Sequence, residues 1–134
     1  MESYEFVVPG RPVSVRSKKR VARRNWIELV KSEANRVAPA IPFVEPGLRL
    51  VIIFLWGATT LIDVDNVIKP IQDALSDVMY LDDAIITDVE AYRRTWTDPS
   101  HPEGLPLLLR QPWLDHEEYV YVRVEQRETD EETQ

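Results

Sequence analysis

Residues 48–83 read LRLVIIFLWGATTLIDVDNVIKPIQDALSDVMYLDD, and they hold the clearest structural signals in the chain. Leu48 to Trp56 is almost entirely apolar and rich in Val and Ile, which predicts a central strand buried on both faces. Asn66 is placed to cap a following helix that reaches about Asp77. Pro70 fits that helix only if the helix begins shortly before it.

The flanking sequence supplies the other elements. Alternation of polar and apolar residues predicts strands, and apolar residues at helical spacing predict a helix. The predicted elements are strands at Tyr4–Val8, Ala84–Trp96 and Glu118–Glu125, a helix from about Arg20 to Val37, and a loop over Asp98–Pro112 with a short extended piece at Leu107–Leu109. This order predicts an α+β fold with a mixed β-sheet and two principal helices packed against it.

The chain has 134 residues, which is enough for one compact domain. We expect that domain to span residues 1–125 and the acidic, polar residues 126–134 to form a disordered tail. The sequence contains no cysteine, which excludes disulfides and thiolate metal sites. The N-terminus lacks a signal-peptide pattern, and the longest apolar run is too short to span a bilayer. We therefore expect a cytoplasmic protein with no membrane partner.

Charge is strongly segregated along the chain, although the net charge is -7. Residues 11–24 hold seven Lys or Arg and no acid, whereas residues 62–90 hold eight acids and one base, Lys69. Basic side chains at a helix start oppose the helix dipole, which suggests that they are kept for an anionic ligand. A solvated helix start is the alternative. We predict a DNA-contacting surface made of Arg16, Lys18, Lys19, Arg20, Arg23 and Arg24.

The acidic centre predicts a metal site. Asp63 and Asp65 lie two residues apart at a strand-to-helix junction, and their side chains point the same way if the chain is still extended there. Asp82 and Asp83 follow one helix later, where the chain turns back. Clustered carboxylates repel one another unless a cation lies between them, and oxygen ligands without His or Cys favour Mg²⁺ or Mn²⁺. The alternative is that each acid is a turn, cap or solvated helix residue.

Three motifs in this region resemble the signature of RusA-family Holliday junction resolvases. The family pattern is D-x-D-N with a Lys four residues after the second Asp, then D-A-L, then a D-D pair. Here the motifs are Asp63–Pro70 (DVDNVIKP), Asp73–Leu75 (DAL) and Leu81–Asp83 (LDD). The clear resemblance covers about residues 60–90, and the set of motifs is much more specific than any one of them.

The resemblance implies a RusA-like fold and a Mg-dependent endodeoxyribonuclease that resolves Holliday junctions by paired nicks. It further implies a homodimer that binds branched DNA. Asp63, Asp65 and Asp83 would be catalytic metal ligands, and Lys69 would be a catalytic cation. Asp82 is the uncertain further ligand, since either half of the pair could bind the metal.

Two other functions fit parts of the sequence. One is a module that binds branched DNA without cutting it, and the other is a metal-dependent hydrolase of free nucleotides. The intact acid–lysine set argues against the first, and the basic segment argues for a polymeric substrate. The tryptophans Trp26, Trp56, Trp96 and Trp113 are expected in the core or an interface, and nothing assigns a role to His101 or His116.

Overall fold

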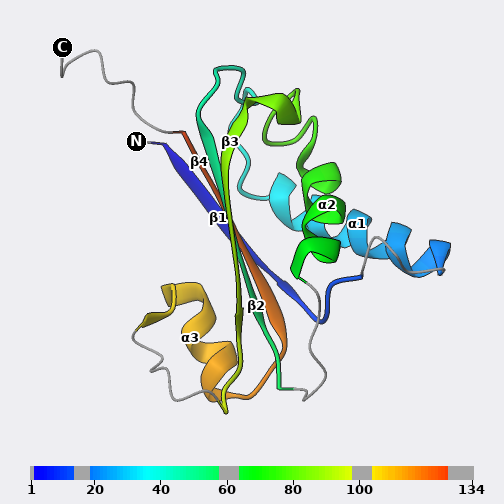
Figure 1. Ribbon diagram of the computed structural model, residues 1–134, viewed down its shortest axis with the longest axis vertical. Helices are drawn as coiled ribbons and strands as arrows, with labels where there is room; N and C mark the ends of the chain where they lie inside the picture. Colours follow the sequence, from blue (N-terminus) through cyan, green and yellow to red (C-terminus); the bar gives the residue numbers. More distant parts are fainter. Residues whose placement is uncertain (1, 14–18, 58–63, 98–103, 127–134) are drawn as a thin grey trace.

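A mixed β-sheet organises the part of the chain that the computed structural model describes, which is residues 2–13, 19–57, 64–97 and 104–126 (Figure 1). Its four strands are β1 (Ser3–Pro9), β2 (Leu48–Leu55), β3 (Ile86–Arg94) and β4 (Tyr119–Gln126). The strand order is β1-β4-β2-β3, with β4 antiparallel to β1 and β2, and β3 parallel to β2.

The strand β2 lies at the centre, because it pairs with β4 on one side and β3 on the other over its whole length. Seven of its eight residues are buried, and only Arg49 is half-buried. The run of apolar residues therefore predicts this strand correctly. It is apolar on both sides because each face of the sheet carries a helical layer.

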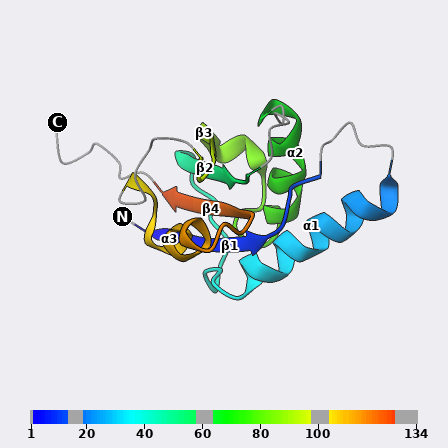
Figure 2. The ribbon, with the colours of Figure 1, turned by 90° about the horizontal axis from the view of Figure 1, so that it is seen from below.

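The helices α1 (Arg20–Asn35) and α2 (Val64–Leu75) pack side by side on one face of the sheet (Figures 1 and 2). The larger core forms there, with Leu50, Ile52 and Phe54 of β2 against Trp26 of α1 and Ile71 of α2. No helix in the described part of the chain is long and apolar enough to cross a membrane.

A third helix, α3 (Leu107–Leu114), covers part of the opposite face. The prediction of a loop with an extended piece at Leu107–Leu109 is therefore wrong. Leu109 and Trp113 are four residues apart and both buried, so a helix places both side chains against Ile53 and Leu55. That burial outweighs the helical hydrogen bond that Pro112 cannot donate.

The predicted start of α2 is also wrong. The helix includes Val64, so Asn66 lies inside its first turn rather than at the cap. Pro70 lies in the middle of the helix, not near its start. Its ring is buried with Val67 and Ile71, and this packing accounts for a proline at an interior position.

The strand predicted from Ala84 is shorter in the structure. Asp83–Ile85 form a short 3₁₀ turn, η1, and β3 begins only at Ile86. The strand β4 includes Gln126, one residue beyond the expected domain boundary, and residues 127–134 lie outside the described part. The predicted α+β fold with a mixed sheet is confirmed, with one more helix than expected.

Candidate functional site

The exposed face of α2 carries Asp65, Lys69 and Asp73 at intervals of four residues. This spacing places them in one row along the helix, opposite the buried face that holds Val67 and Ile71. The ammonium of Lys69 lies 2.9 Å from the carboxylate of Asp73. The row is therefore a line of alternating charges beside the sheet.

Asp83 approaches the same row from the segment that follows α2. Its carboxylate lies 3.9 Å from the Lys69 Nζ, so Lys69 is between two acids. Hydrogen bonding to Asp73, together with the charges of Asp73 and Asp83, raises the pKa of the Lys69 ammonium. All three side chains are about half exposed (50–53%), so these ion pairs contribute little to stability.

The two acids of the Asp82–Asp83 pair take different roles in the structure. The Asp82 side chain accepts a hydrogen bond of 2.9 Å from the Ala84 backbone N–H and caps η1. Asp83 instead faces Lys69. This division favours Asp83 as the member of the pair that belongs to the site, and ligation by Asp82 stays a prediction.

The buried Tyr80 holds the segment that carries Asp83 against α2. Its hydroxyl donates a 2.7 Å hydrogen bond to the Gln72 carbonyl of α2. Burial raises the pKa of the Tyr80 hydroxyl, and the negative charges of Asp83 and Asp73 raise it further. The turn before it places Asp77 at φ 70°, a left-handed conformation that Asp tolerates. Sequence reasoning missed Tyr80; its only signal is a hydroxyl-bearing aromatic residue just before the acid pair.

The predicted alignment of the Asp63 and Asp65 side chains requires an extended backbone at both residues. Asp65 is exposed in the first turn of α2, so the extended spacing that would align two side chains does not apply to it. Asp63 lies outside the described residues. Within those residues, no group of three or more His, Cys, Asp or Glu is arranged to hold a metal ion. The predicted ligands that are described, Asp65, Asp82 and Asp83, offer carboxylate oxygens, the chemistry that suits a hard divalent cation.

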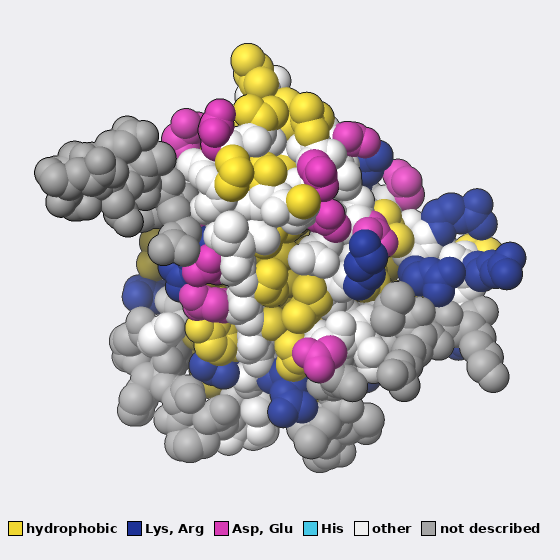
Figure 3. All heavy atoms as spheres, turned by 45° about the horizontal axis from the view of Figure 1, so that its top comes forward, with side chains coloured by type: hydrophobic (Ala, Val, Ile, Leu, Met, Phe, Trp, Pro, Cys, Tyr) yellow, Lys and Arg dark blue, Asp and Glu magenta, His cyan; other side chains and the backbone are white. Residues whose placement is uncertain are grey.

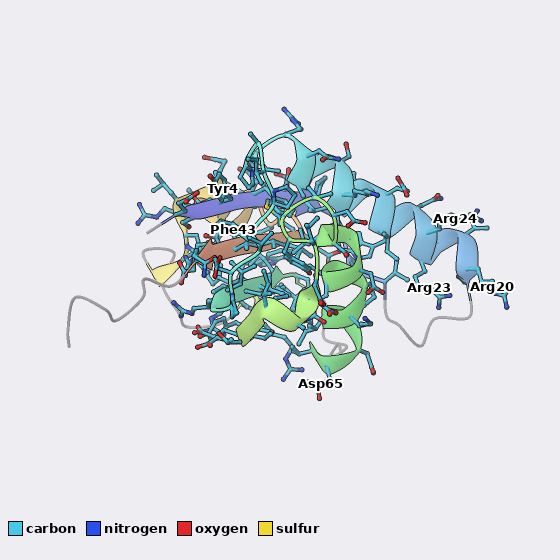
Figure 4. All side chains as sticks on the ribbon, turned by 90° about the horizontal axis from the view of Figure 1, so that it is seen from above. Tyr4, Arg20, Arg23, Arg24, Phe43 and Asp65 are labelled. Atoms are coloured by element: carbon cyan, nitrogen blue, oxygen red, sulfur yellow. The ribbon has the colours of Figure 1, made fainter. Side chains whose placement is uncertain are left out.

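The basic residues predicted to contact DNA extend from the start of α1. Arg20, Arg23 and Arg24 lie at the end of α1 that projects from the body of the molecule (Figure 4). Trp26 is the first residue of α1 to be buried. Lys19 is exposed at the N-cap, where no side chain caps the helix. Arg16 and Lys18 lie outside the described residues.

The space-filling view places opposite charges near one another. Figure 3 shows Lys and Arg side chains gathered at the edge where α1 begins, with Asp and Glu side chains over the neighbouring surface. The helix α1 packs against α2, and its basic end projects beyond that contact (Figures 1 and 2). The same side of the sheet thus carries a basic helix end, which would attract a polyanion, and a row of two acids and one lysine on α2.

A comparison with protein families gives one finding. The model of the family described as RusA, endodeoxyribonuclease RusA, matches residues 11–102, which is more than half of the chain. The match includes the basic segment, β2, α2 and β3, and it ends before α3. No curated protein matches the sequence.

Proposed function

The chain belongs to the RusA family of endodeoxyribonucleases, and from that premise we propose that it is a magnesium-dependent endonuclease that resolves Holliday junctions by paired nicks. The observation that carries the proposal is the position of Lys69 between Asp73 and Asp83, one helical turn from Asp65. These are residues of the motifs by which the sequence resembles the family.

Asp63, Asp65 and Asp83 are the proposed metal ligands, and Asp82 is the further candidate. Bound there, Mg²⁺, or Mn²⁺ in its place, would activate water and neutralise negative charge on the phosphate. The proposal fits the oxygen-only donors of the described residues, and it assigns Asp63 its role from the family motif.

Lys69 is the proposed catalytic cation. The two acids that flank it keep its ammonium protonated and hold it in place beside Asp83. A fixed positive charge stabilises the negative charge that develops on a phosphodiester as it is attacked. Asp73 is then a positioning residue, since its 2.9 Å contact orients Lys69.

The start of α1 is the proposed phosphate-binding surface. The net charge of -7 would repel DNA at long range, so binding needs a local surface of the opposite sign. Lys19, Arg20, Arg23 and Arg24 supply such a surface within the described residues, and Arg16 and Lys18 extend it in the sequence.

We propose a homodimer because a Holliday junction has two equivalent strands that must be nicked in pairs. A two-fold dimer supplies two sites related by the symmetry of that substrate. Sedimentation equilibrium at micromolar concentration should show a dimer. A monomer that also binds the junction one-to-one would contradict paired nicking.

One assay tests the proposed function directly. Purified protein is incubated with a synthetic four-way junction, a linear duplex or a mononucleotide, each with Mg²⁺, with Mn²⁺ or with EDTA. We expect cleavage of the junction alone, with either metal and not with EDTA. Junction binding without cleavage would indicate a binding module, and hydrolysis of the nucleotide alone would indicate a phosphohydrolase.

A further inference from the structure

The end of α3 has an unusual residue at a position that glycine normally takes. The His116 N–H donates to the Trp113 carbonyl (3.2 Å), and the Glu117 N–H donates to the Pro112 carbonyl (2.9 Å). This pair of bonds is the Schellman motif, which places one residue in the left-handed conformation. His116 takes that conformation, with φ 54°. Glycine is the usual residue at this position, and histidine is one of the few others that adopt its left-handed backbone.

The imidazole of His116 lies flat on the indole of Trp96. The two ring centroids are 5.1 Å apart and the planes differ by 4°. The indole also covers Gly57, where a Cβ would collide with it. His116 is exposed and Trp96 half-buried. We call this pair the aromatic stack.

Trp96 of the aromatic stack is more exposed than the other tryptophans of the chain. Trp26, Trp56 and Trp113 are each less than a tenth exposed, so they take the first of the two predicted places, the core or an interface. Trp96 instead bears an exposed ring on its surface. A planar, solvent-exposed ring is the kind of surface on which a nucleobase stacks.

The location of the aromatic stack suits a nucleic-acid ligand. Trp96 follows β3 and Gly57 follows β2, so the stack lies at the end of the sheet where these parallel strands finish (Figure 1). The residues after Gly57 lead to α2 and its acids. Arg93 and Arg94 end β3 close by, and the Arg94 guanidinium lies over the Tyr92 ring, 5.1 Å from its centroid.

A second contact ties this end of the sheet to the basic segment. The Glu118 carboxylate accepts two hydrogen bonds from the Arg11 guanidinium, at 2.8 and 3.0 Å. These bonds lower the pKa of Glu118, as does a hydrogen bond from the Gly57 backbone. Arg11 begins the basic run of residues 11–24. Trp96 of the aromatic stack thus contacts Gly57, which precedes α2 in the sequence. Glu118, two residues after His116, binds Arg11, which begins the basic run.

We propose that the aromatic stack receives an unpaired nucleobase of the DNA, exposed where the helical arms of a branched substrate meet. The open face of His116 would stack on that base, and the nearby arginines would contact the adjoining phosphates. This inference rests on the proposed function and adds a base-binding site to it. His116 lies beyond residues 11–102 and Trp96 lies within them, so the family match covers only one of the two stacked rings.

The substitution His116→Gly removes the imidazole ring and leaves the fold intact, because glycine suits the left-handed backbone at this position. The test measures affinity for a four-way junction with 2-aminopurine at the branch point, and for a fully paired linear duplex, both in EDTA. We expect junction affinity to fall by about fivefold or more, with less quenching of the 2-aminopurine. Duplex affinity and the melting temperature should not fall. Asp115→Asn, at the neighbouring exposed position, is the matched control and should behave as the wild type.

Two results would overturn the inference. One is unchanged junction affinity and quenching in His116→Gly. The other is an equal loss of affinity for junction and duplex, which would indicate a general phosphate contact. Both readouts are made without metal, so they do not depend on cleavage. A wild-type protein that binds but does not cut would refute the proposed nuclease function and leave this test intact.

Discussion

The two helices on the same face of the sheet carry opposite arrangements of charge. The start of α1 holds cations alone, on a part of the helix that projects from the core. The exposed face of α2 alternates acid, base and acid, and Asp83 adds a further acid from outside the helix. A cluster of charges of one sign attracts a polyanion over a distance, whereas charges of alternating sign largely cancel beyond contact. The difference separates a surface for binding from a surface for chemistry.

Neither arrangement serves stability. Basic residues oppose the helix dipole at the start of α1, and half-exposed ion pairs on α2 contribute little to folding. Substitutions in either region should therefore change function much more than the free energy of unfolding.

The largest effect is expected from the acids of the α2 region. Asp65→Asn and Asp83→Asn should each reduce the single-turnover cleavage rate at least about a hundredfold, because each removes a charge from the proposed metal site. Affinity for the junction should be unchanged or slightly tighter, since negative charge near phosphate is lost. Asp77→Asn is the matched control, because Asp77 is an exposed acid of the same segment and Asn also tolerates its left-handed backbone.

Asp82→Asn sharpens the same comparison. The amide oxygen can still accept the hydrogen bond from the Ala84 N–H, so η1 should keep its cap. We expect a milder loss of cleavage than in Asp83→Asn. Full inactivation by Asp82→Asn with an active Asp83→Asn would reverse the assignment of the ligand.

Lys69→Ala should lower the cleavage rate more than it lowers junction affinity. We expect the single-turnover rate to fall by about tenfold or more. One cation among acids adds little to long-range attraction, so junction affinity should change little. Lys31→Ala, at an exposed position on α1, is the charge-matched control. An unchanged rate would show that Lys69 forms only structural ion pairs and takes no part in catalysis.

The pKa of Lys69 also predicts a pH profile. Because that pKa is raised, the ammonium stays charged below the ordinary lysine value of about 10.4 and is lost only above it. The wild-type rate should therefore show no decline from this group between about pH 7 and 9.

Replacing Arg20, Arg23 and Arg24 with Gln should weaken binding without changing the rate at saturation. Each lost phosphate contact should lower the slope of log affinity against log salt by about one. Arg36→Gln, just past the other end of α1, should leave the slope unchanged. If the triple variant keeps the wild-type slope, the DNA follows another path across the protein.

Sequence patterns predicted the parts of this molecule that depend on neighbours along the chain. The apolar run of β2 is such a local signal, and the structure contains the buried strand that it predicts. The helix α3 was missed because its proline suggests a loop, while its stability comes from packing Leu109 and Trp113 on a distant strand.

The same limit applies to the site. The order of the motifs predicted that Lys69 and Asp83 belong to one site. In the structure the Lys69 Nζ lies 3.9 Å from an Asp83 carboxylate oxygen. The separate roles of Asp82 and Asp83 depend on a turn whose backbone geometry no motif encodes. The hydroxyl of Tyr80 meets the Gln72 carbonyl only because the chain folds back on α2.

The smallest effect is expected from Tyr80→Phe. Loss of its hydrogen bond to the Gln72 carbonyl should lower the free energy of unfolding by about 1 kcal/mol, measured as a lower urea midpoint with an unchanged slope. Cleavage should fall only slightly, because Phe keeps the buried ring that supports Asp83. A loss of cleavage as large as in Asp83→Asn would show that the hydroxyl itself acts in the site.

The separation of binding from chemistry can be measured in one experiment. Junction affinity and the cleavage rate at saturating protein are determined in parallel for Asp83→Asn and for the triple variant of Arg20, Arg23 and Arg24. We predict that Asp83→Asn binds the junction and does not cut it, while the triple variant binds weakly and cuts at the wild-type rate once saturated. Cleavage by Asp83→Asn at the wild-type rate, or slow cleavage by the saturated triple variant, would contradict it.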